Sequence, residues 1–207
     1  MAPMEAISFR KTSPERSTQA VKEAADDQSL VARAEAGDQE AFAALVHRYA
    51  DRIYTLVAGM IHDRTAVEDV VQDIFFKVYR KLSAFQGRSS FYTWLYRVSL
   101  NTATDHLKKK RRDRHRHVED PTVLDRPDFT GGPDETMDRE ELRQKTSEAI
   151  ASLPTKYRDI LLLREYQELS YEEIADVLQC SKGTVESRLF RARARLRSKL
   201  EPYLKRG

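Results

Sequence analysis

The sequence predicts an all-α protein with two small helical domains joined by a flexible linker, the C-terminal one containing a helix-turn-helix. Apolar residues recur at helical spacing through most of the chain. Glycine and proline, seven each among 207 residues, are too few for a turn-rich β fold. An acidic stretch with three prolines and two glycines separates the helical segments into two groups.

The N-terminal domain is predicted at residues 28–112, after a tail of residues 1–27 that we expect to be disordered. Asp38 is suited to cap a helix. The apolar residues of that helix share one face: Phe42, Leu45, Val46, Tyr49, Ile53, Leu56, Val57 and Met60. The remaining helices are predicted at Gln28–Ala36, at about Thr65–Leu82, and from about Ser90 onward after a loop at Ser83–Ser89.

Charge is distributed in blocks that the net charge of +3 conceals. Residues 105–117 contain seven Lys or Arg and two Asp, a net charge of +5. Residues 182–206 contain nine Lys or Arg and two Glu, a net charge of +7, while residues 118–141 contain nine acids and two Arg, a net charge of −7. Two basic blocks around an acidic one indicate two nucleic-acid surfaces with a separate element between them. We assign residues 113–139 to an acidic flexible linker.

The C-terminal domain is predicted at residues 140–207. Its first two helices are expected at Asp138–Ser152 and Thr155–Gln167. Ser170 and Glu173 then have the spacing of a capping box, which predicts a helix from Tyr171. After a break of three residues, Ser181 is suited to cap another helix. Two short helices around a tight turn are typical of a helix-turn-helix.

The second helix of this motif carries a basic stripe. Arg188, Arg191 and Arg195 recur at steps of three and four, which places them on one face. A basic stripe on a recognition helix suits contacts to phosphates and to guanine edges. A solvated charged face is the common alternative, but the preceding turn and the scarcity of acids in this block favour DNA binding.

Several classes of function are disfavoured. A single cysteine argues against a disulfide framework or a cysteine-rich zinc site, and no run of 18 apolar residues or secretory signal is present. His115 and His117 lack partners that would complete a metal shell. We find no glycine-rich phosphate loop or activated nucleophile. The sequence therefore predicts a cytoplasmic protein that is not an enzyme and uses no cofactor or metal.

Three segments occur in a specific order: Asp69–Leu82 (DVVQDIFFKVYRKL), Phe91–Asn101 (FYTWLYRVSLN) and Tyr171–Phe190 (YEEIADVLQCSKGTVESRLF). Together they resemble the extracytoplasmic-function (ECF) sigma factors of the sigma-70 family, small two-domain bacterial transcription initiation factors, and within these the envelope-stress group. The resemblance covers about Gln28–Arg112 and Glu140–Arg206. It implies a region 2 domain and a region 4 domain that bind core RNA polymerase and make it promoter-specific.

The resemblance implies that the third predicted helix docks on the clamp helices of the largest polymerase subunit, and that region 4 meets the flap of the second-largest subunit. The candidate core-binding residues are Asp69, Gln72, Asp73, Phe76 and Lys77. The spacing of the first four places them on one exposed face. From the residues alone, a solvated acidic face is the more common meaning of such a pattern.

The resemblance also implies that the loop after this helix holds a flipped-out base of the minus-ten element. Single-stranded bases need a pocket or an aromatic platform beside a basic track. The candidates are Phe85, Gln86, Gly87, Arg88, Ser89, Ser90, Tyr92, Arg97, Asn101 and Lys108. Phe91, Trp94 and Val98 have the spacing of the buried stripe and are assigned to the core.

The recognition helix is expected to enter the major groove at the minus-thirty-five element. The candidates are Lys182, Thr184, Glu186, Ser187, Arg188, Phe190, Arg191 and Arg195. Glu186 departs from close relatives, which often carry a basic residue at this step. A carboxylate accepts a hydrogen bond from cytosine and repels phosphate, so an altered promoter preference is predicted.

Members of this family are typically held inactive by an anti-sigma factor, and we expect such a partner here. Two other classes stay open: a dimeric helix-turn-helix repressor or activator, and a sigma-like interaction protein. The acidic linker has two interpretations, plain disorder or an imitation of RNA charge. The cancelling charge blocks further predict that the isolated chain binds DNA poorly.

Overall fold

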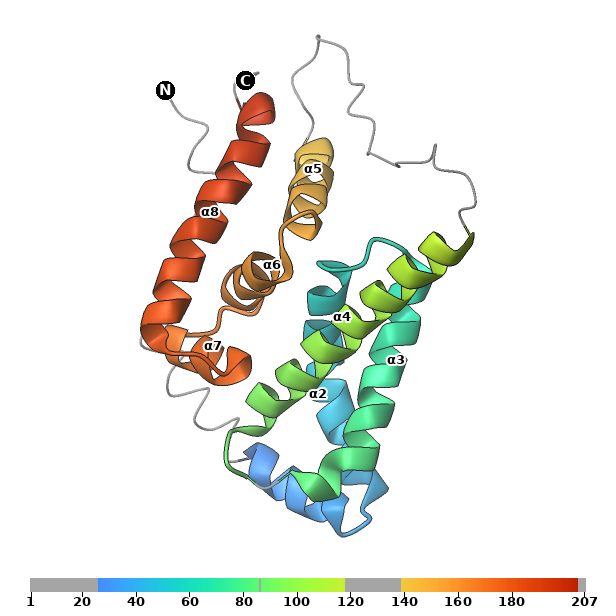
Figure 1. Cartoon of the computed structure of the whole chain (residues 1–207). Coiled ribbons are helices and arrows are strands. Elements are labelled where there is room, and N and C mark those ends of the chain that lie inside the picture. Colours follow the sequence, from blue (N-terminus) through green and yellow to red (C-terminus); the bar gives the residue numbers. More distant parts are fainter. Residues whose placement is uncertain (1–25, 86, 118–138, 205–207) are drawn as a thin grey trace.

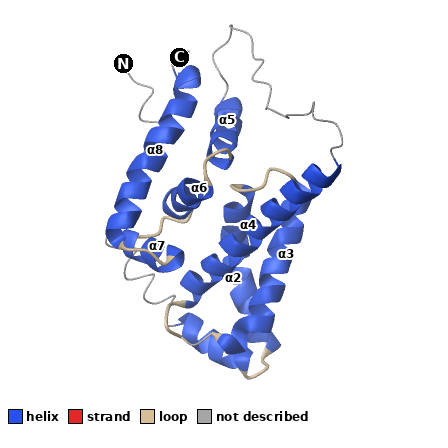
Figure 2. Ribbon diagram, viewed as in Figure 1, coloured by secondary structure: helices blue, strands red, loops and turns tan. Residues whose placement is uncertain are grey.

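The computed structural model describes residues 26–85, 87–117 and 139–204, which contain helices and loops but no strand (Figure 2). Residues 26–35 form a first helix. The other elements of the N-terminal domain are α2 (Gln39–Ala58), α3 (Arg64–Lys81), the short 3-10 helix η2 (Leu82–Ala84) and α4 (Phe91–His117). The prediction of an all-α fold is confirmed.

Local signals explain where the first helices begin and end. The Asp38 side chain accepts a hydrogen bond from the backbone N–H of Ala41 at 3.1 Å, as its predicted capping role requires. Gly37 before it has φ +94°, a conformation that favours glycine. Asp63 caps α3 in the same way through Ala66, a cap that sequence reasoning missed.

Residues 26–35 are fastened to α2 by a buried carboxylate. Asp27 is 1% exposed and accepts hydrogen bonds from the Tyr49 hydroxyl and, at 2.6 Å, from Nη1 of Arg48. Burial raises the pKa of Asp27 against the opposing effect of these donors. The predicted disordered tail reached residue 27, but Asp26 and Asp27 belong to the helix because Arg48 and Tyr49 hold them there.

The C-terminal domain comprises α5 (Arg139–Ala151), α6 (Thr155–Leu161), the π-helical turn η3 (Leu162–Tyr166), α7 (Tyr171–Leu178) and α8 (Lys182–Leu204). The predicted helix at Thr155–Gln167 is thus an α-helix that widens into a π turn, in which Leu162 and Leu163 are buried. The predicted flexible linker began at residue 113, but α4 continues through His117. Residues 118–138, most of that linker, lie outside the described residues.

The helix-turn-helix has the predicted capping pattern. The backbone N–H of Glu173 donates to Ser170 Oγ at 3.2 Å, and the backbone N–H of Ser170 donates to Glu173 Oε2 at 2.7 Å. Ser181 Oγ accepts from the backbone N–H of Thr184 at 3.2 Å and caps α8. Between them Gln179 turns the chain with φ +49°, a left-handed residue that a glycine would usually supply.

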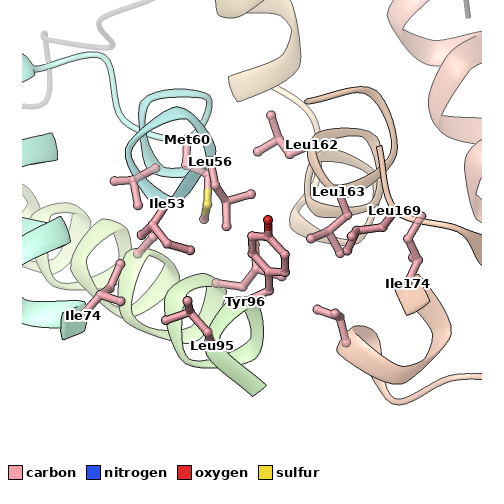
Figure 3. Packing of buried hydrophobic residues seen from close by; sticks show 14 of the residues in the cluster. Ile53, Leu56, Met60, Ile74, Leu95, Tyr96, Leu162, Leu163, Leu169 and Ile174 are labelled. Carbon is pink, nitrogen blue, oxygen red and sulfur yellow. The ribbon is translucent and has the colours of Figure 1, made fainter. Parts of the chain in front are cut away.

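The two domains pack directly against each other, which the sequence did not predict. The start of α4 lies beside α7, and α2 lies beside η3 (Figure 1). One continuous buried cluster joins them. Figure 3 shows Leu56 of α2 and Met60, just beyond the end of that helix, on one side of Tyr96, and Leu162 and Leu163 of η3 on the other. No helix among the described residues combines the length and hydropathy needed to cross a bilayer.

Candidate nucleic-acid interface

The recognition helix α8 buries one side and exposes the other. Val185 and Leu189 are buried against the domain core, as their spacing predicted. On the opposite side Phe190 is 77% exposed, the most open of the large apolar side chains in the described ranges. Glu186 and Ser187 are exposed on the turn before it, so the three predicted residues share an open surface.

The basic stripe of α8 only partly points to solvent. The Arg195 guanidinium lies 5.0 Å from the centre of the Tyr157 ring of α6, which holds it against the domain by a cation–π contact. Arg191 is exposed and Arg188 is half-buried. Arg188 and Arg191 therefore remain available for phosphate contacts, whereas Arg195 already contacts Tyr157 within the chain.

The first turn of α8 contains an ion pair with α7. The Lys182 ammonium lies 2.5 Å from Glu172 Oε1, and its hydrogen bond lowers the pKa of that carboxyl. Thr184, another predicted minus-thirty-five residue, is half-buried; its backbone N–H is taken by Ser181 and its hydroxyl lies 2.8 Å from Ser181 Oγ. Thr184 thus also holds the helix start in place.

The predicted minus-ten loop is anchored by aromatic packing. Phe85 lies 5.3 Å from Trp94 and 6.1 Å from Phe91, measured between ring centres. This packing agrees with the assignment of Phe91 and Trp94 to the core. Gly87 has φ +64°, and Arg88 beside it is exposed. Gln86 lies outside the described residues.

The other predicted minus-ten residues divide into open and occupied positions. Asn101 and Lys108 are exposed on α4, and Ser89 is half-exposed. Ser90 Oγ accepts from the backbone N–H of Thr93 and starts α4. Tyr92 and Arg97 are half-buried because both contact the C-terminal domain.

The predicted polymerase-binding face of α3 is present with one exception. Asp69, Gln72 and Asp73 are exposed, and the Phe76 ring is 58% exposed. Lys77 turns away and donates to Thr102 Oγ1 of α4 at 3.3 Å. Sequence reasoning missed two exposed aromatic side chains of these helices, Tyr54 of α2 and Tyr79 of α3, the second with its ring 5.0 Å from that of Phe42. Tyr54 and the first two α3 residues line a shallow pocket with Glu68 and Val71.

The described residues contain no group of three or more His, Cys, Asp or Glu side chains placed to hold a metal ion. The exposed groups suited to a partner are instead an acidic-aromatic face on α3, a basic face along α4 and the open side of α8. Such a set fits a protein partner and nucleic acid, in line with the charge blocks of the sequence.

Comparison with known proteins assigns both domains. The model for sigma-70 region 2 matches residues 45–113, and the model for sigma-70 region 4 matches residues 143–196. The chain is 42% identical over 187 residues to the RNA polymerase sigma-H factor of Pseudomonas aeruginosa, covering 86% of this chain and 96% of that protein. It is 42% identical over 188 residues to the ECF RNA polymerase sigma-E factor of Escherichia coli strain K12, covering 87% and 97%.

Two solved structures are similar to this chain over most of its length. CnrH in complex with the cytosolic domain of CnrY is similar with a TM-score of 0.64 at 29% identity, covering 86% of this chain and 98% of that one. The sigma factor RpoE of Bartonella quintana, in complex with the anti-sigma factor NepR, is similar with a TM-score of 0.59 at 25% identity, covering 77% and 96%. Both domains are thus those of a sigma-70-type transcription factor. The chain belongs to the extracytoplasmic-function sigma factors of the sigma-70 family.

Proposed function

We propose that this protein binds core RNA polymerase and directs promoter-specific initiation of transcription. One observation carries the proposal: a region 2 domain and a region 4 domain stand in one chain, and the recognition helix of the second exposes one side to solvent. The protein supplies recognition, and the polymerase supplies the chemistry. Core polymerase is cytoplasmic, so we place the protein in the cytoplasm.

The minus-thirty-five element is read by α8 in the major groove. The Glu186 carboxylate is suited to accept a hydrogen bond from a cytosine amino group, and the exposed Phe190 ring is suited to contact a thymine methyl group. Arg188 and Arg191 supply phosphate or guanine contacts beside them. Glu186 supports a sequence preference that differs from that of relatives with a basic residue there.

The minus-ten element is read by the loop before α4 and by α4 itself. Exposed Arg88, Asn101 and Lys108 form a polar and basic track beside the aromatic loop anchor. A track of this kind suits a single strand whose bases are displaced from the duplex. Reading two short elements with two small linked domains raises affinity through effective concentration.

The acidic-aromatic face of α3 is the proposed docking site for the clamp helices of the polymerase. Asp69, Gln72 and Asp73 offer acceptors, and the exposed Phe76 ring offers an apolar anchor on the same face. We also propose that an anti-sigma factor regulates the protein, because CnrH was solved with the cytosolic domain of CnrY, and Bartonella RpoE with the anti-sigma factor NepR.

The test is run-off transcription from a promoter selected out of randomised DNA by the protein together with core polymerase. Transcripts should appear only when both are present. Asp73→Arg should abolish pull-down of core polymerase, while Glu35→Arg, the same charge reversal at an exposed site on residues 26–35, should not. Equal transcription by core polymerase alone would refute the function. Dimeric binding to repeated half-sites without polymerase would favour a repressor or activator.

A further inference from the structure

The start of the recognition helix carries a cation between two acids. Lys182 opens α8, and its ammonium lies 2.5 Å from Oε1 of Glu172 on α7, the helix beside it (Figure 1). Glu186 follows Lys182 by four residues, which places it on the same face of α8 one turn further on. Lys182 therefore has one acid within reach on each helix, and the structure shows it paired with the one on α7.

The charge along α8 gives this pairing a consequence for DNA recognition. Residues 188–197 contain five arginines and no acid, whereas residues 182–187 contain one lysine and one glutamate. The first turns of a recognition helix are the ones that contact base edges. Because these turns carry no net charge, base recognition there depends on where Lys182 and Glu186 are directed rather than on a general attraction to phosphate.

Glu172 is suited to hold the lysine. It lies in the first turn of α7, where the helix dipole favours an acidic side chain. Its carboxylate also reaches the first turn of α8, whose dipole disfavours a cation such as Lys182. The hydrogen bond to Glu172 and the charge of its carboxylate raise the pKa of Lys182, so the ammonium keeps all three protons.

The pairing leaves both residues of α8 able to bind bases. An ammonium group has three N–H donors, and Glu172 accepts from one of them, which leaves two. Glu186 is exposed and makes no ion pair with any described residue. Without Glu172, Lys182 and Glu186 would have the spacing of an ion pair within one helix, and each would occupy the other.

We propose that Glu172 is a positioning residue for promoter recognition: it holds Lys182 away from Glu186, so that the lysine donates to a guanine and the glutamate accepts from a cytosine in the minus-thirty-five element. Guanine presents two acceptors in the major groove, and cytosine presents an amino donor. The inference rests on the proposed function and deepens it, because it adds a residue outside the recognition helix to those that determine sequence preference.

Base preference is the measurement that isolates this role. Competition binding of the reconstituted polymerase compares the selected promoter with versions in which each base pair of the minus-thirty-five element is substituted in turn. A preference is a ratio of two affinities, so a uniform change in attraction to DNA cancels. Lys182→Met should lower one guanine preference by at least about fivefold, and Glu186→Ala should lower one cytosine preference as much, which identifies the two base pairs.

Glu172→Gln should change both preferences although its side chain contacts neither base. We expect the guanine preference to fall about fivefold, because Lys182 must then be ordered on binding. The cytosine preference should fall about twofold, because Lys182 then competes for Glu186. In a Lys182→Met background, Glu172→Gln should alter neither preference, since it acts only through the lysine.

Two further variants separate positioning from folding. Glu40→Gln makes the same change in the first turn of α2 and should leave both preferences at the wild-type value. Lys182→Arg keeps a charged donor at the start of α8 and suits guanine. The guanine preference should therefore persist in Lys182→Arg, and Glu172→Gln should still lower it.

Unchanged preferences in Glu172→Gln, with normal run-off transcription, would overturn the positioning role alone. An equal effect of Glu172→Gln in the Lys182→Met background would also overturn it, because Glu172 would then act through the fold of α7. A uniform loss of affinity on every sequence in Lys182→Met, with the salt slope reduced by about one, would make the lysine a phosphate contact and overturn its guanine contact. Absent transcription from wild type would overturn the proposed function instead.

Discussion

Phe190 provides a direct test of how α8 meets DNA. An aromatic side chain has about 150–250 Å² to bury, and Phe190 is 77% exposed in the free protein, which leaves about 150 Å² for a partner. If the groove covers half of that area, about 25 cal/mol per Å² gives about 2 kcal/mol, or about 30-fold in affinity. Phe190→Ala should therefore weaken promoter binding by about 30-fold.

The assay is competition binding of the reconstituted polymerase to the selected promoter over a range of salt concentrations. Phe190→Ala should leave the salt dependence unchanged, because it removes no charge, whereas Arg188→Ala should reduce its slope by about one. Thermal unfolding should be unaffected, since the ring is largely in water. Tyr166→Ala, which removes an exposed aromatic outside α8, serves as the matched control.

A loss below about threefold for Phe190→Ala would contradict the placement of this ring in the groove. A loss of equal size on DNA lacking the minus-thirty-five element would also contradict it, because a base contact must depend on sequence. An accompanying drop in melting temperature would instead assign the ring a structural role.

Substitutions at three further sites test local features. Tyr49→Phe leaves the buried Asp27 carboxylate without one hydrogen-bond donor and should lower the free energy of unfolding, measured in urea, by about 1–3 kcal/mol. A decrease under about 0.5 kcal/mol would contradict this hydrogen bond. Ser170→Ala should cost about 1 kcal/mol in the same assay, and Ser170→Asn should recover most of it. Lys182→Met should raise the lowered pKa of Glu172 in an NMR titration. The ion pair between Lys182 and Glu172 stabilises the fold at pH values above the ordinary pKa of glutamate. This stabilisation is lost as the pH falls through the lowered pKa of Glu172.

Most of the helical framework could be predicted because its signals are local. Asp38 and Ser181 lie at helix starts, where a cap is needed. In the capping box, the side chains of Ser170 and Glu173 each accept a hydrogen bond from the backbone N–H of the other residue. Helical periodicity then selects the residues that face each domain's own core. These features need no knowledge of distant parts of the chain.

The π turn and the contact between domains could not be predicted in this way. Nothing local marks Leu162 as the start of a π turn, or Gln179 as a residue with positive φ. The start of α4 did carry a signal: from Phe91 to Leu100 every residue is buried or half-buried, and a helix covered on all sides must have neighbours on all sides. Which element covers Tyr96 depends on long-range packing that periodicity does not contain.

The composition of the interface explains how closure can be both stable and reversible. Five of the hydrogen bonds between described residues cross it, around the apolar contact of Leu162. At about 0.5–1.5 kcal/mol each, they amount to about 2.5–7.5 kcal/mol. Moving a two-state equilibrium from 99:1 to 1:99 takes about 5.5 kcal/mol, and a partner bound with nanomolar affinity provides about 12 kcal/mol. A partner bound with nanomolar affinity would keep at least about 4.5 kcal/mol after separating the domains, whereas a short DNA element bound by one domain with micromolar affinity, about 8 kcal/mol, would keep only about 0.5–5.5 kcal/mol.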